Sequence, residues 1–201
     1  MTNTKKQTTS EKTFRLAGLA ILTALIIVLQ VVTTYFPTKP FAVTLALMPI
    51  VVGSALYGKW AGAYLGAVFS VVVIIMCAIG GDVGGQMVFN ANPFLCIVLC
   101  MLKGSAAGFV AGLLYSLLEK KNTIVATVVA AAAAPVVNTG IFILGLLAFF
   151  RPTLQAWAGE TDILVYAISF MVSINFLVEL IVNVILSPVI VRIIQIIKKQ
   201  K

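Results

Sequence analysis

Two ionisable side chains and a set of amides interrupt the long apolar stretches of this chain. Lys103 and Glu179 each lie well inside an apolar run, where an unpaired charge costs about 3 kcal/mol or more. Asn175, Glu179 and Asn183 recur at every fourth residue and therefore share one helix face. A buried Lys103–Glu179 ion pair with satisfied amides would account for these residues. So would a polar solute cavity inside a bundle, to which Asn138 would contribute.

The residue types argue against catalysis. The chain has no histidine, so it lacks the general base of a Ser–His hydrolase and the imidazole ligand of most catalytic metals. Glu179 is the single carboxylate at membrane depth, and no Walker A motif for ATP hydrolysis is present. Cys77, Cys96 and Cys100 fall in or beside apolar runs and are interpreted as small packing residues. We expect a protein that is not an enzyme and has no metal or cofactor.

Six apolar runs must position the polar groups. Hydrophobic residues make up 61% of the chain and charged residues 10%, and about 20 apolar residues cross a bilayer as a helix. The expected spans cover residues 14–36, 43–57, 60–79, 94–118, 123–149 and 163–196. The predicted fold is all-α: a polytopic membrane protein with six transmembrane helices in one compact bundle, residues 14–197. A polar, poorly ordered cytoplasmic leader (1–13) precedes the bundle and a basic cytoplasmic tail (198–201) follows it.

The polar connections between the spans place further candidates at one side of the membrane. The segment GGDVGGQMVFNANP, residues 80–93, is rich in glycine and asparagine and predicts an irregular outer loop. Residues 151–162 form a second outer segment, which carries Pro152 and Gly159. The side chains that could close a cavity from this side are Gln86, Asn90, Asn92, Arg151 and Trp157.

The net charge of +8 is distributed asymmetrically. With six spans and both termini in the cytoplasm, the cytoplasmic cations are Lys5, Lys6, Lys12, Arg15, Lys59, Lys120, Lys121, Arg192, Lys198, Lys199 and Lys201. Lys39 and Arg151 fall outside, and Lys103 lies within a span. This distribution follows the positive-inside rule. The basic residues therefore orient the protein and contact anionic lipid, and they do not indicate a nucleic-acid partner.

Small residues recur at the spacing of helix-packing motifs. Glycines repeat every fourth residue in two of the expected spans, as Gly58, Gly62 and Gly66 and as Gly104, Gly108 and Gly112. Such faces let helix backbones approach closely in lipid, and the two sets are expected to pack on each other. Ala17, Ala20 and Ala24 form a third small stripe, on the first span. This stripe is either an internal packing face or a docking face for another membrane protein.

The order and spacing of these motifs resemble those of a known family. The stretch Ala20-Ile-Leu-Thr-Ala24, the tight turn in LYGKWAGAYLG and the segment KGSAAGFVAGLLY are similar to those of the substrate-binding S components of energy-coupling factor (ECF) transporters. The resemblance covers nearly the whole chain. It implies high-affinity uptake of a vitamin across a bacterial cell membrane. It also implies two kinds of partner, a transmembrane coupling subunit that docks on Ala20 and Ala24, with Ala17 adjoining, and two cytoplasmic ATPases.

In that family the solute binds to the outer loops and to the outward halves of the later helices. The candidate solute-binding residues are Asn90, Asn92, Lys103, Asn138, Arg151, Asn175 and Glu179. A cation at Lys103 or Arg151 suits a carboxylate-bearing vitamin, pantothenate before folate. Riboflavin would need a flatter apolar slot with amide partners such as Asn138 and Asn175. Two other functions stay open: a stand-alone secondary transporter with Glu179 as proton carrier, and a structural assembly subunit.

Overall fold

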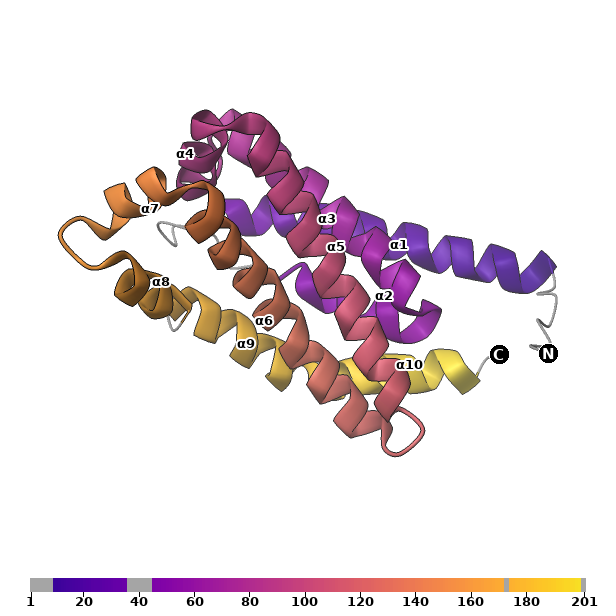
Figure 1. The fold of residues 1–201 in the computed structure, drawn as a ribbon. Coiled ribbons are helices and arrows are strands. Elements are labelled where there is room, and N and C mark those ends of the chain that lie inside the picture. Colours follow the sequence, from indigo (N-terminus) through magenta and orange to yellow (C-terminus); the bar gives the residue numbers. More distant parts are fainter. Residues whose placement is uncertain (1–8, 36–44, 172–173, 200–201) are drawn as a thin grey trace, which may run out of the picture.

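Every described segment of the protein with regular structure is helical. The structure is a computed structural model that describes residues 9–35, 45–171 and 174–199; the expected leader lies mostly outside these ranges. The described residues form α1 (Thr9–Thr34), α2 (Leu47–Tyr57), α3 (Lys59–Ile79), α4 (Val83–Ala91), α5 (Pro93–Leu118), α6 (Thr123–Phe149), α7 (Arg151–Ala158), α8 (Ile163–Met171), α9 (Ile174–Ile185) and α10 (Ser187–Lys199) (Figure 1).

The expected all-helical, polytopic membrane fold is confirmed. Among the described residues, α1, α3, α5 and α6 are each long and apolar enough to cross a membrane. The expected span 43–57 contains the shorter apolar helix α2. The expected span 163–196 is divided into α8, α9 and α10, and the axes of α9 and α10 differ by 43°. Pro188 lies at this bend; it lacks the N–H that would continue the backbone ladder.

The glycine faces of α3 and α5 pack directly on each other, as their spacing predicts. A Cβ atom placed on Gly66 would lie 2.0 Å from the carbonyl oxygen of Gly104, and one on Gly62 would lie 2.3 Å from that of Gly108. The Ser70 hydroxyl donates to the Cys100 carbonyl oxygen across the same interface, at 2.6 Å. Since lipid supplies little hydrophobic drive for helix association, this backbone contact and hydrogen bond stabilise the centre of the bundle.

Residues 80–93 are not an irregular loop, because Val83–Ala91 forms α4. The glycine-rich composition predicts a loop, but close packing against α3 explains why glycine occurs within this helix. A Cβ atom on Gly85 would lie 2.3 Å from the sulfur of Cys77 on α3. Gly85 therefore lets a short helix lie close against the end of α3, and this close approach offsets its low helix propensity.

Asparagine caps set where the two central helices begin. The Asn92 side chain accepts a hydrogen bond from the backbone N–H of Leu95 at the start of α5, and Pro93 occupies the first helical position. The Asn122 side chain accepts from the N–H groups of Ile124 and Val125 at the start of α6. Each cap satisfies donors that a helix start leaves open, so α5 and α6 begin at defined residues.

The bundle has two chemically different ends (Figure 1). One end, here called the α4–α7 end, carries α4, α7 and α8, and the Trp157 indole N–H donates to the Met87 sulfur there at 3.1 Å. The opposite end carries the start of α1, the α2–α3 and α5–α6 turns and the end of α10. At that end the Arg15 guanidinium donates to the backbone oxygen of Tyr57 at 3.3 Å. The described cations Lys59, Lys120, Lys121 and Arg192 belong to elements of this second end.

Candidate functional site

Lys103 on α5 points toward α6. Its Nζ atom lies 4.4 Å from the ring centroid of Phe142, and in the described part of the chain it forms no ion pair with a carboxylate. A desolvated cation–aromatic contact contributes about 2 kcal/mol, whereas a lysine at the centre of a membrane helix costs about 3 kcal/mol on insertion scales. The Phe142 ring therefore offsets only part of the cost, and an anionic group beside Lys103 would be stabilising.

Asn138 lies one helical turn from Phe142 on the same face of α6. The residue is 6% exposed, and its Oδ1 atom is buried without a hydrogen-bond donor in the described part of the chain. A buried polar atom without a partner costs about 1–3 kcal/mol. Because Phe142 touches Lys103, the cation and this acceptor lie in adjacent turns of the α5–α6 interface.

Asp82 is a further polar residue whose carboxyl is affected by the charge of Lys103, and it was not among the candidates predicted from the sequence. The residue directly precedes α4, and its Oδ1 atom is buried without a hydrogen-bond donor among the described residues. Burial raises the pKa of its carboxyl, while the amide of Gly85 and the ammonium of Lys103 lower it. The Lys103 charge thus acts on Asp82. An isolated acid among glycines was the available signal, but it is also typical of a solvated turn.

Three buried thiols belong to α3 and α5 in the same part of the bundle. Cys77, Cys96 and Cys100 are buried in the hydrophobic core, as the packing interpretation predicts, and the Cys77 thiol lies within hydrogen-bonding reach of the other two. Cys100 is one helical turn from Lys103 on α5, and Cys77 lies against Gly85 beside the Asp82 carboxylate. The thiols of α3 and α5 therefore pack in the hydrophobic core beside the start of α4.

The polar residues Glu179 and Asn183 belong to α9, which packs against α6. Glu179 is 6% exposed and Asn183 is fully buried. The Asn183 side chain donates to the backbone oxygen of Glu179 at 2.8 Å, which leaves the Asn183 Oδ1 atom without a donor in the described residues. Asn175 belongs to α9, but its side chain lies outside the described part of the structure.

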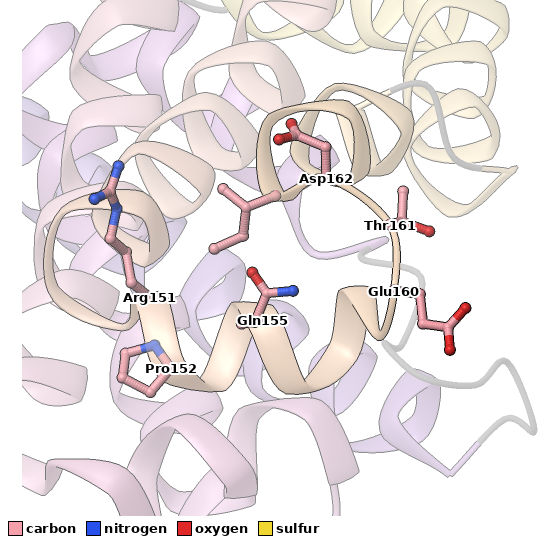
Figure 2. Close-up of a pocket in the computed structure, with 7 residues that line it drawn as sticks. Arg151, Pro152, Gln155, Glu160, Thr161 and Asp162 are labelled. Atoms are coloured by element: carbon pink, nitrogen blue, oxygen red, sulfur yellow. The ribbon is translucent and has the colours of Figure 1, made fainter.

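The remaining candidates at the α4–α7 end are separate from Lys103 and Asn138. Asn90 and Asn92 are exposed, and Asn92 is engaged as the cap of α5. Exposed Arg151 borders an open pocket of about 600 Å³ beside α7, and Figure 2 shows Gln155 and Asp162 around the same space. The lining of this pocket is Arg151, Pro152, Gln155, Glu160, Thr161, Asp162 and Ile163.

The alanine stripe of α1 faces away from the bundle. Ala17, Ala20 and Ala24 are all exposed, and so are the large apolar side chains of Leu16 and Ile21 beside them. Of the most hydrophobic part of α1, 17% is buried inside the protein. The internal-packing interpretation is therefore wrong for these three residues in the described structure, and the stripe is open to lipid or to a partner.

Comparison with known proteins agrees with this architecture. The family model for the ECF transporter substrate-specific component matches residues 14–191. The chain is also similar to a protein of Lactococcus lactis subsp. cremoris (strain MG1363), the "Pantothenic acid transporter PanT". The two are 32% identical over 190 residues, which cover 87% of this chain and 90% of the relative. The chain therefore belongs to the substrate-specific components of ECF transporters, which are multi-pass membrane transport subunits and not enzymes.

Proposed function

We propose that this chain captures pantothenate at the outer face of a bacterial cell membrane and delivers it to an ATP-driven ECF module. The observation that carries the choice of solute is Lys103, a half-buried cation that lies over the Phe142 ring and whose charge also reaches the Asp82 carboxyl. The similarity to a pantothenic acid transporter supports the same solute.

The chemistry of pantothenate matches the groups at the α5–α6 interface. The vitamin carries a carboxylate at one end, an amide in the middle and hydroxyls at the other end. The Lys103 ammonium would bind the carboxylate through a charge-assisted hydrogen bond. The Asn138 Oδ1 atom, which lacks a donor in the described structure, would accept from the amide N–H or from a hydroxyl. We prefer Lys103 to Arg151 because Arg151 is exposed, and exposed ion pairs contribute at most about 1 kcal/mol.

The other candidates take peripheral roles in this proposal. Asn175 and Glu179 would contribute from α9, which packs on α6. Asn90, Asn92 and Arg151, at the α4–α7 end, would lie at the entrance for the solute. This end would face the outside, because the basic residues of the opposite end, including Lys120 and Lys121, are expected in the cytoplasm together with both termini.

The exposed face of α1 is proposed as the docking surface for the transmembrane coupling subunit, which two cytoplasmic ATPases would drive. Ala17, Ala20 and Ala24 lack bulky side chains, so a partner helix could approach the α1 backbone closely. The exposed apolar residues around them would be covered by the same partner or by lipid acyl chains.

The test of the solute is a binding experiment with a matched pair of lysine variants. Calorimetry on the purified protein should show pantothenate binding, and Lys103→Gln should weaken it by about 100-fold, the loss of a charge-assisted hydrogen bond. Lys59→Gln is the control, because Lys59 also lies over an aromatic ring, Phe109, but at the opposite end of the bundle. Pantothenol, which carries an alcohol in place of the carboxylate, should bind the wild type about as weakly as pantothenate binds Lys103→Gln.

Three outcomes would contradict the proposal. Binding of riboflavin or folate without binding of pantothenate would assign another vitamin to the site. Equal loss in the Lys59 and Lys103 variants would show that the effect is not local. Uptake of pantothenate into liposomes that contain this chain without the ATPase module, abolished by Glu179→Gln, would favour an ion-coupled secondary transporter.

A further inference from the structure

The open pocket beside α7, here called the α7–α8 pocket, lies between the end of α6 and the start of α8. Its lining begins at Arg151, just after α6, and ends at Ile163, the first residue of α8. The helices α6 and α8 pack on each other. Both expose large apolar side chains within a few residues of the pocket: Phe149 on α6 and Leu164 and Ile168 on α8. A polar pocket of about 600 Å³ therefore borders an apolar surface where membrane-spanning helices reach the headgroup region.

Charges of both signs line this pocket. They are the guanidinium of Arg151 and the carboxylates of Glu160 and Asp162, and no ion pair joins these three groups in the described structure. In Figure 2, Arg151 lies on one side of the space and the two acids on the other, with Gln155 between them. The carboxylates outnumber the cation by one, so the pocket as a whole attracts positive charge.

The backbone from residue 159 to 162 gives the pocket a defined shape. Gly159 has φ +59°, a conformation that favours glycine, and its carbonyl oxygen accepts a hydrogen bond from the Gln155 side chain at 2.9 Å. Asp162 caps α8, because its Oδ1 atom accepts from the N–H groups of Leu164 and Val165 at 2.8 and 3.2 Å. The second oxygen of Asp162 accepts no hydrogen bond from a described residue and is available to a donor from outside the chain.

A ligand for this pocket must combine an anionic group for Arg151 with a cation that donates hydrogen bonds to the carboxylates. The excess of carboxylate disfavours a ligand of net negative charge. Contacts between exposed charges are weak, so occupancy requires a ligand at high local concentration, which membrane lipids provide at this surface. A phospholipid with a primary ammonium meets each condition, because its acyl chains also match the apolar surface of α6 and α8.

We propose that the α7–α8 pocket binds the headgroup of phosphatidylethanolamine in the leaflet that meets the α4–α7 end of the bundle. The Arg151 guanidinium donates to the phosphate, the free oxygen of Asp162 accepts from the ammonium, and Glu160 adds negative charge beside it. Phosphatidylcholine is disfavoured because its quaternary ammonium has no N–H to donate. Phosphatidylglycerol is disfavoured because it brings a negative charge and no cation. The pocket is separate from Lys103, so this inference does not depend on which solute the protein captures.

The experiment measures which phospholipid stays with the full-length protein. The chain is reconstituted into nanodiscs with equal amounts of phosphatidylethanolamine, phosphatidylcholine and phosphatidylglycerol of identical acyl chains. Native mass spectrometry then counts the lipids that remain bound after the protein is released from the disc. The wild type should retain phosphatidylethanolamine about fivefold over phosphatidylcholine, the ratio that one exposed charge-assisted contact supports. The N,N-dimethyl lipid, which keeps a single N–H donor, should be retained to an intermediate degree.

Three variants separate the contributions of the charges. Glu160→Gln/Asp162→Asn removes both negative charges, while the asparagine keeps the capping acceptor of α8; it should bring the retention of the two zwitterionic lipids to within about twofold of each other. Glu11→Gln/Glu119→Gln is the matched control, because it removes two acids at the opposite end of the bundle (Figure 1) and should keep the wild-type ratio. Arg151→Gln should lower the retention of all three lipids by a similar factor, because each of them carries a phosphate.

The unfolding temperature of Glu160→Gln/Asp162→Asn shows whether the start of α8 is intact. If this variant unfolds early, the single variant Glu160→Gln, at an exposed position that caps no helix, replaces it and should still lower the lipid ratio. Equal retention of the three lipids by the wild type, preferred retention of phosphatidylglycerol, or a preference that survives the loss of the acids would overturn the proposal.

A last measurement separates a lipid from a soluble zwitterion with the same headgroup. Glycerophosphoethanolamine, which carries the phosphate and the ammonium without acyl chains, should not displace the bound lipid, because the apolar contacts with α6 and α8 are missing. Efficient displacement would assign the pocket to water-soluble compounds and overturn the lipid assignment. Pantothenate binding enters none of these outcomes, so this inference and the proposed function fail independently.

Discussion

The replacement of Gly66 by alanine tests the packing that holds α3 against α5. A Cβ atom at this position would lie 2.0 Å from the carbonyl oxygen and 2.6 Å from the carbonyl carbon of Gly104. Both atoms belong to the backbone, so no side-chain rotation can relieve the overlap. A carbon–oxygen contact needs about 3.3 Å, whereas the Cβ atom would lie 2.0 Å from the Gly104 oxygen. The helices α3 and α5 would therefore have to separate locally by more than about 1 Å.

The size of the effect follows from two losses. Forcing a methyl group into a packed interface costs about 1–3 kcal/mol. The separation would also stretch the hydrogen bond from the Ser70 hydroxyl to the Cys100 carbonyl oxygen, 2.6 Å long, and such a bond contributes about 1 kcal/mol. Together these losses amount to about 3 kcal/mol, so Gly66→Ala should unfold on the order of 10 °C below a glycine-to-alanine variant that has no clash.

The assay is thermal unfolding of purified variants in one detergent. Gly140→Ala is the matched control, because Gly140 lies in the interior of α6 and a Cβ atom there meets nothing within 4 Å. Both substitutions gain the same helix propensity, about 1 kcal/mol, so the difference between them isolates the clash. Equal unfolding temperatures for Gly66→Ala and Gly140→Ala would refute the packing of these two glycine faces.

Three further predictions concern other parts of the chain. Ala20→Trp should leave pantothenate affinity within about twofold of the wild type, because the side chain is exposed, but should abolish ATP-dependent uptake in proteoliposomes with the complete module; lost binding would contradict a docking role. Burial raises the pKa of Asp82, so its carboxyl keeps a proton to higher pH in the folded state than in the unfolded chain. The ligand-free protein should therefore become more stable as the pH falls from neutral into the acidic range. Asp82→Asn should flatten this dependence of unfolding temperature on pH, and an unchanged slope would assign it to other groups. Asn122→Ala should cost about 1 kcal/mol of unfolding free energy through the lost cap of α6, whereas Ser116→Ala, at another exposed position near the same turn, should cost less.

The helical membrane fold and its central packing could be predicted from the sequence. Long apolar runs admit few structures in lipid, because the backbone must satisfy its own hydrogen bonds. The fourfold spacing of Gly62 and Gly66, and of Gly104 and Gly108, identified the two faces that meet. The exposure of Ala20 was not predictable in the same way, because a small-residue stripe serves equally for internal packing and for docking.

The site was less accessible to sequence reasoning, because it depends on which helices face each other. The depth of Lys103 in its helix indicated that it needs a partner, but Phe142 and Asp82 lie in other elements and have no fixed spacing from it. Asp82 was also obscured by its glycine-rich context, which predicted a loop where α4 forms. Asn92, counted among the candidate ligands, has a local role as a helix cap.

The central claim is that this chain binds pantothenate by itself and depends on the ATPase module for transport. The most direct test is equilibrium binding of radiolabelled pantothenate to the purified chain, followed by competition with unlabelled pantothenate, pantothenol, riboflavin and folate. We expect saturation at one solute per chain, with displacement by pantothenate and little displacement by the other three. Absence of saturable binding, or displacement by pantothenol as efficient as by pantothenate, would contradict it.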